Sequence, residues 1–208
     1  METLLATLTE QAKAYSGLEL AAVVFAILYL VLAIRENIWC WLCAMISTAI
    51  YVWILIVAKL YMDSALNIFY FAMAIYGWFV WRSGASNDDG LPVSVWPAKI
   101  HFTAIIVIAI LSATSGFLLA RYTDAAYPYV DSATTFTAIW ATFLVARKVL
   151  ENWWYWLVID FVSIAIYWSR DLELTALLFV VYVALIPLGL VSWTHSYRNR
   201  QNPVVLAA

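Results

Sequence analysis

The stretch Glu151-Asn152-Trp153-Trp154-Tyr155-Trp156, with the apolar run that follows it to Tyr167, decides how this chain folds. It predicts a membrane helix with one carboxylate, Asp160, near its middle. A carboxylate at mid-membrane depth costs roughly 2.5–3.5 kcal/mol to insert, so we expect Asp160 to face the bundle interior or a wet cavity. At helical spacing, the residues that share its face are Trp153, Trp156, Ser163 and Tyr167. An aromatic face with one negative charge indicates a site for a flat, positively charged ligand.

The composition of the rest of the chain fits such a helix. Of its 208 residues, 66% are hydrophobic and 12% are charged, whereas soluble domains carry about 25% charged residues. The sequence therefore predicts an all-α protein that crosses the membrane several times. The net charge of −2 argues against nucleic acid as a partner. The first apolar run, Leu18 to Ile34, lacks a basic segment before it, so no cleavable signal peptide is predicted.

Hydropathy marks seven transmembrane helices joined by short loops. They are predicted over Glu19 to Ile34, Trp39 to Val57, Ser64 to Trp81, Ile100 to Ala120, Ser132 to Ala146, Asn152 to Trp168 and Leu174 to Trp193. The side that is richer in Lys and Arg should be cytoplasmic. That side holds Arg35, Arg82, Lys99, Arg147, Lys148, Arg198 and Arg200. The N-terminus is then outside and the C-terminus is cytoplasmic.

An internal repeat organises these helices. Glu36-Asn37-Ile38-Trp39-Cys40-Trp41-Leu42 matches Glu151-Asn152-Trp153-Trp154-Tyr155-Trp156-Leu157, which places Met45 opposite Asp160. Farther on, the residues Leu60, Tyr70, Gly77 and Trp81 pair with Leu172, Tyr182, Gly189 and Trp193. Each helix reverses the direction of the chain across the membrane, so two three-helix copies joined directly would be inverted relative to each other. One linker helix between the copies restores the orientation and makes the repeats parallel. We therefore expect a 3+1+3 plan with a first repeat and linker at 1–99, a linker helix at 100–120 and a second repeat with the tail at 121–208, and parallel repeats of this kind place substrate between them.

The predicted substrate site combines the polar and aromatic stripes of both repeats. Its residues are Asn67, Tyr70, Trp156, Asp160, Ser163, Tyr167, Tyr182, Trp41 and Tyr51. Asn67 has an alternative role, since an amide inside a membrane helix can instead bond a neighbouring helix. Asn37 and Asn152 are predicted to cap helices rather than to bind ligand.

Catalytic, cofactor and metal sites are not predicted. The sequence has no P-loop, no G-x-S-x-G and no H-E-x-x-H pattern, so we expect a membrane protein that is not an enzyme. Cys40 and Cys43 open an apolar helix and are interpreted as small packing residues. His101 and His195 lie at membrane edges with no evident partners, so neither is interpreted as a ligand or a proton relay.

Three stretches together resemble the PnuC family of bacterial vitamin transporters. They are Arg35 to Trp41, the run from Leu60 through Asn67 and Tyr70 to Trp78, and Arg147 to Trp153. The resemblance implies a seven-helix fold related in plan to the SWEET sugar transporters, located in the bacterial inner membrane. It also implies a homotrimer and facilitated diffusion of nicotinamide riboside, which a cytoplasmic kinase then traps by phosphorylation. Members that transport nicotinamide riboside usually carry Gln where this chain has Asn67. The pattern Leu66-Asn67 followed by Tyr70 is similar to members of the thiamine-type PnuT branch.

Two other function classes stay open. A proton-coupled vitamin symporter could use Asp160 as its protonatable group, because low dielectric favours the protonated carboxyl; no second acid or His completes a relay. A membrane receptor or assembly subunit is the third class. It is disfavoured because a scaffold has no need for a buried carboxylate. The leading prediction is a uniporter for a small cationic aromatic vitamin precursor, nicotinamide riboside or thiamine.

Overall fold

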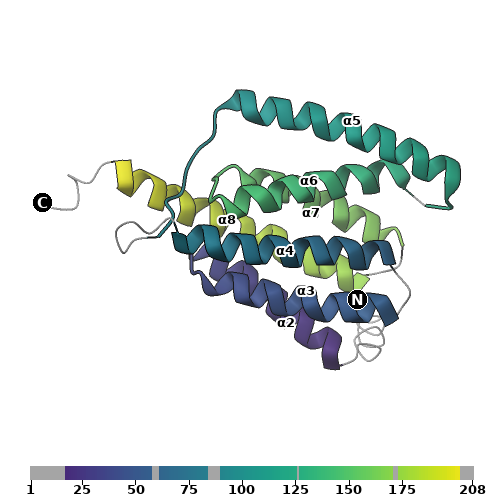
Figure 1. The fold of residues 1–208 in the computed structure, drawn as a ribbon, viewed down its shortest axis with the longest axis horizontal. Coiled ribbons are helices and arrows are strands. Elements are labelled where there is room, and N and C mark those ends of the chain that lie inside the picture. Colours follow the sequence, from purple (N-terminus) through teal and green to yellow (C-terminus); the bar gives the residue numbers. More distant parts are fainter. Residues whose placement is uncertain (1–16, 58–60, 84–89, 126, 171–172, 202–208) are drawn as a thin grey trace, which may run out of the picture.

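The computed structural model describes residues 17–57, 61–83, 90–125, 127–170 and 173–201, without the side chains of 61–63 and 173–174. Over this part of the chain it shows seven helices. They are α2 (Gly17–Ile34), α3 (Trp39–Val57), α4 (Tyr61–Ser83), α5 (Ala98–Tyr122), α6 (Pro128–Ala146), α7 (Asn152–Trp168) and α8 (Glu173–Gln201). Figure 1 shows them running along one common direction. The seven predicted helices are thereby confirmed in position.

One helix end differs clearly from the prediction. α8 continues to Gln201 instead of ending at Trp193. The hydropathy of the segment falls after Trp193, but Arg198 and Arg200 in the last turn suit the negative end of the helix dipole. Hydropathy marks where a helix leaves the apolar layer and not where its hydrogen bonds end.

Six of the helices form a ring. Around it α2 contacts α3, α3 contacts α4, α4 contacts α6, α6 contacts α7, α7 contacts α8, and α8 returns to α2. α3 and α7 therefore lie on opposite sides of the ring. α5 lies outside the ring against α6, as Figure 1 shows at the top of the bundle.

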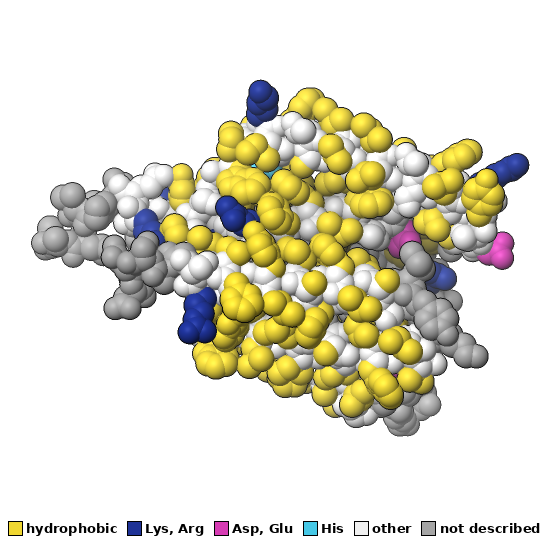
Figure 2. Space-filling view, viewed as in Figure 1, with side chains coloured by type: hydrophobic (Ala, Val, Ile, Leu, Met, Phe, Trp, Pro, Cys, Tyr) yellow, Lys and Arg dark blue, Asp and Glu magenta, His cyan; other side chains and the backbone are white. Residues whose placement is uncertain are grey.

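The apolar character of the surface agrees with a membrane location. Five of the described helices, namely α2, α3, α4, α5 and α8, are long and apolar enough to cross a bilayer. α7 has 17 residues and so measures about 25 Å at 1.5 Å per residue, slightly less than a typical hydrocarbon core. Figure 2 shows hydrophobic side chains over the middle of the visible face, with charged side chains mostly toward its two ends.

The corners that join α2 to α3 and α6 to α7 have the same unusual backbone. Glu36 has φ 55° and Lys148 has φ 49°, which is the left-handed region that non-glycine residues seldom adopt. In both corners the chain turns within a few residues, with backbone bonds from Cys40 to Asn37 and from Asn152 to Val149. The Asn37 side chain accepts the Trp39 N–H at 3.0 Å, so its predicted capping role is confirmed.

Candidate functional site

The ring encloses a cavity of about 300 Å³ that touches all six of its helices. Of the nine residues predicted for the site, seven line this cavity: Trp41, Tyr51, Asn67, Tyr70, Trp156, Asp160 and Tyr182. The structure thus brings together residues from α3, α4, α7 and α8 that are far apart in the sequence. Tyr29 of α2 and Thr142 of α6 also line it and were not predicted.

Two predicted residues do not line the cavity. Ser163 is buried on α7 beyond the cavity wall. Tyr167 stacks on Phe179, with ring centroids 5.4 Å apart and planes at 11°, and Phe179 is itself a lining residue. Tyr167 therefore packs behind a lining residue and does not line the cavity itself. The polar and aromatic face of α7 continues beyond the end of the cavity.

Asp160 is buried among hydroxyl groups. It is only 4% exposed, and no hydrogen bond or ion pair links its carboxylate to another residue in the described ranges. Tyr29, Tyr51, Tyr70 and Tyr182 line the same cavity and bring hydroxyl groups to it. No Lys or Arg is among the lining residues, and Asp160 is the one acidic residue among them.

Three further buried polar atoms at the cavity have no hydrogen-bond partner among the described residues: Trp41 Nε1, Trp153 Nε1 and Asn152 Oδ1. Such atoms are rare in folded proteins. The two indole N–H groups can donate to a ligand, and the amide oxygen can accept from one. Ligand groups of both kinds would satisfy them.

The capping prediction for Asn152 was wrong. Its side-chain amide donates to the Val149 carbonyl at 2.7 Å, and Asn152 is fully buried at the cavity instead of bonding the first turn of α7. Sequence spacing could not reveal this, because Glu-Asn before an apolar helix is typical of a cap.

The two halves of the ring share one set of contacts between indoles and glycines. Trp41 packs on Gly77, and Trp153 packs on Gly189, so closely that a Cβ at either glycine would overlap the indole. Trp41 meets Trp81 at 5.4 Å and 86°, while Trp153 meets Trp193 at 5.4 Å and 84°.

These pairs correct the predicted alignment of the halves. Trp41 corresponds to Trp153 and not to Trp156, a separation equal to the 112 residues between Glu36 and Lys148. On this register Thr48, and not Met45, stands opposite Asp160. Thr48 lines the cavity, and its hydroxyl donates to the Ala44 carbonyl at 2.7 Å, so it brings no free donor.

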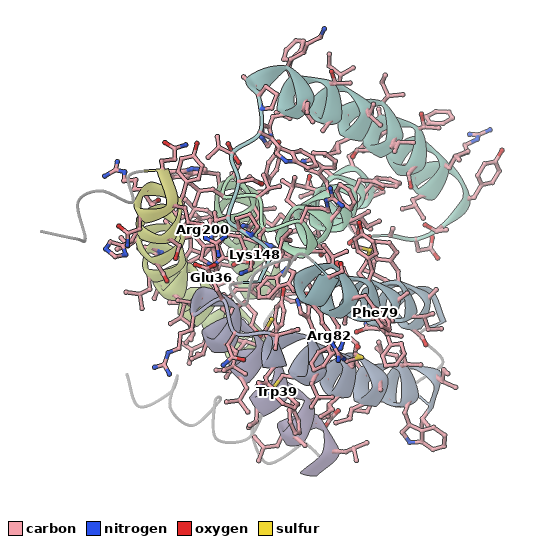
Figure 3. All side chains as sticks on the ribbon, turned by 60° about the vertical axis from the view of Figure 1, so that its left-hand side comes forward. Glu36, Trp39, Phe79, Arg82, Lys148 and Arg200 are labelled. Carbon is pink, nitrogen blue, oxygen red and sulfur yellow. The ribbon has the colours of Figure 1, made fainter. Side chains whose placement is uncertain are left out.

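The indoles and an ion pair join the halves at one end of the bundle. Trp81 donates to the Val145 carbonyl at 3.3 Å, and Trp193 donates to the Ala33 carbonyl at 3.0 Å. Glu36 and Lys148 form an ion pair at 3.0 Å, and they lie side by side in Figure 3. The Lys148 ammonium also lies 4.5 Å from the centre of the Trp81 ring. Trp41 and Trp153 line the cavity, and Trp81 and Trp193 pack against them in the same buried core.

His101 has partners that the sequence did not indicate. Its Nδ1 lies 3.0 Å from the Tyr155 hydroxyl, and its Nε2 lies 3.9 Å from a Glu151 carboxylate oxygen. The other Glu151 oxygen accepts the Trp96 N–H at 3.4 Å. These contacts fasten α5 to the corner before α7, away from the cavity. In the described part of the chain, no group of three His, Cys, Asp or Glu residues could hold a metal ion.

Comparison with known proteins places this architecture in a family. The sequence model of the family described as "Nicotinamide mononucleotide transporter" matches residues 16–195. The chain belongs to this family. It is a multi-pass membrane protein, and its relatives are transporters and not enzymes.

Members with assigned substrates are distant relatives. The chain is 24% identical over 210 residues to the nicotinamide riboside transporter PnuC of Escherichia coli K12, covering 89% of this chain and 88% of the relative. It is 25% identical over 142 residues to the riboflavin/roseoflavin transporter RibM of Streptomyces davaonensis, covering 66% of each. A crystal structure of the vitamin B3 transporter PnuC shares the fold, with a TM-score of 0.70 and 21% identity over 94% of this chain and 90% of that one. The predicted PnuC family is confirmed.

Proposed function

We propose that the protein is a uniporter that moves a small aromatic vitamin cation, nicotinamide riboside or thiamine, across the bacterial inner membrane. The observation that carries this proposal is the Asp160 carboxylate, buried in an aromatic cavity without a basic partner among the described residues. A cation stacked on aromatic rings beside one carboxylate is stabilised by both. A cavity of about 300 Å³ is at the small end of ligand pockets, which suits a vitamin of this size.

The charge of the cavity favours a riboside over a mononucleotide. A phosphate group would enter a space whose lining holds Asp160 and no Lys or Arg. Desolvating a phosphate beside a carboxylate is unfavourable. Lys148, a buried cation, is already paired with Glu36. Relatives named for nicotinamide riboside support the same choice.

The proposed architecture is two parallel three-helix repeats with seven spans, joined by α5 in the SWEET-like plan. The matched indole–glycine contacts and the crossed indole hydrogen bonds support it. The assembly proposed is a homotrimer, with the N-terminus outside and the C-terminus cytoplasmic. Net uptake is then driven by a cytoplasmic kinase that phosphorylates the vitamin, since the sequence has no P-loop of its own.

Uptake into proteoliposomes tests the proposal. Purified protein should equilibrate labelled nicotinamide riboside or thiamine across the membrane, with a rate that saturates and that excess unlabelled cation suppresses. A proton symporter using Asp160 is the alternative. It would accumulate substrate above equilibrium when the outside is acidic, whereas the uniporter should reach the same endpoint with and without a pH gradient. Absence of uptake of both vitamins in sealed, protein-containing vesicles would contradict the proposal.

A further inference from the structure

α3 and α7 lie on opposite sides of the cavity. Their residues can be paired at a separation of 112 in the sequence, and each such pair is called a level. At the register fixed by the indole–glycine contacts, the first level is Trp41 with Trp153. The next level toward the cavity is Ala44 with Trp156, and the one after that is Thr48 with Asp160. All six residues line the cavity.

The Ala44–Trp156 level differs from the others in size. The first level pairs two indoles, and the third pairs two side chains of similar volume. At the middle level α7 contributes the largest side chain and α3 contributes a methyl group. At this pair of positions α3 therefore adds only a methyl group to the cavity wall, whereas α7 adds a flat aromatic side chain.

This space has the shape that a flat ring needs. A ring stacked on the Trp156 indole at about 3.5–4 Å lies on the side of the cavity where Ala44 leaves room. Asp160 is four residues farther along α7, which is about 6 Å at 1.5 Å per residue. A cation whose ring rests on Trp156 thus has its charge within reach of Asp160.

We propose that Ala44 determines which rings this transporter accepts, by setting the width of the space opposite Trp156. The inference rests on the proposed function and names the residue that limits substrate size at that site. A single aromatic ring, the pyridinium of nicotinamide riboside or the thiazolium of thiamine, fits above Trp156 beside Ala44. A larger side chain at position 44 occupies the same space and excludes the ring without touching the charge of Asp160.

A graded series at position 44 tests this. Affinity of purified protein for nicotinamide riboside and for thiamine is measured by calorimetry for the wild type and for Ala44→Gly, Ala44→Val and Ala44→Phe. The vitamin that the wild type binds should lose affinity about threefold with Val and more than tenfold with Phe, and keep it with Gly. The Gly variant should also gain measurable affinity for riboflavin, a three-ring vitamin.

Ala49→Phe is the matched control, because Ala49 is an exposed residue on the same helix and does not line the cavity. It should bind like the wild type. Thermal unfolding in detergent verifies that each variant is folded, and Val serves where Phe does not fold. Affinities that stay within twofold across a folded series would overturn the role of Ala44 while leaving the proposed function standing. Binding of neither vitamin by folded wild type would overturn the proposed function, and the role of Ala44 with it.

Discussion

The half formed by α2, α3 and α4 and the half formed by α6, α7 and α8 agree where they hold the bundle together and differ where they line the cavity. Each half packs an indole on a glycine and sends a second indole N–H to a carbonyl of the other half. At the cavity, however, the lining residues at equivalent positions of this register differ: Asp160 corresponds to Thr48, and Trp156 corresponds to Ala44. Packing constrains both halves equally, whereas a ligand without symmetry needs a different surface from each.

The glycines should show the largest effect, and an equal one in both halves. Gly77→Val and Gly189→Val each force a side chain into an indole that already lies against the glycine. Overpacking of this size should destabilise each variant by about 3 kcal/mol, the upper end of the usual range, seen as a lower unfolding free energy in detergent. Gly17→Val is the control, since no described residue lies within 4 Å of a Cβ built at that glycine. If only one of the variants at Gly77 and Gly189 unfolded, the halves would not be equivalent in packing.

The ion pair between the corners should come next. Lys148 and Glu36 side chains are 6% and 19% exposed, so Glu36→Gln leaves a largely buried ammonium unpaired. We expect a loss of about 3 kcal/mol in unfolding free energy, the low end for broken buried pairs.

The charge-swapped double variant Glu36→Lys with Lys148→Glu checks this interpretation. It should recover part of the loss, though not all, because the contact of Lys148 with the Trp81 ring is not restored. A double variant less stable than Glu36→Gln would show that the two corners are not joined by this pair.

At the cavity, equivalent positions should give unequal effects. Asp160→Asn removes a charge-assisted contact and should weaken vitamin binding by about 1–2 kcal/mol. Thr48→Val, its counterpart in the other half, should change affinity less than twofold, because the Thr48 hydroxyl is already bonded within α3. Calorimetric titration measures both. Similar losses in the two variants would mean that the charge is not the distinguishing feature of the second half.

The crossed indole bonds should give the smallest effect. Trp81→Phe and Trp193→Phe each remove one hydrogen bond between the halves, at 3.3 Å and 3.0 Å. Each should lower the unfolding free energy by about 1 kcal/mol, with little change in vitamin affinity, measured in parallel on the same preparations. A large loss of affinity in either variant would place that indole at the ligand.

Much of this arrangement could be predicted from the sequence. Long apolar runs predicted the helices. Asn67, Tyr70 and Asp160 stood out because a polar group in a membrane helix is costly to bury unless it has a polar partner or a ligand. Tyr29 did not stand out, since its helix has only apolar residues and glycine besides Tyr29 itself and Glu19 in its first turn. The repeat stays a proposal, and the matched indole–glycine contacts favour a register in α3 and α7 that differs from the predicted one by three residues. Three residues are almost one helical turn, so both alignments place the same kind of face toward the cavity, and only the contacts with Gly77 and Gly189 distinguish them.

The most direct test of the account uses two ligands of nearly the same shape. Nicotinamide riboside carries a positive ring, and its reduced dihydro form is neutral. Calorimetric titration of the wild type should show the cation binding about tenfold more tightly, and Asp160→Asn should bring the two affinities together. Equal affinities in the wild type, or a preference that survives in Asp160→Asn, would contradict the claim that one carboxylate from one half of the ring selects a cationic vitamin.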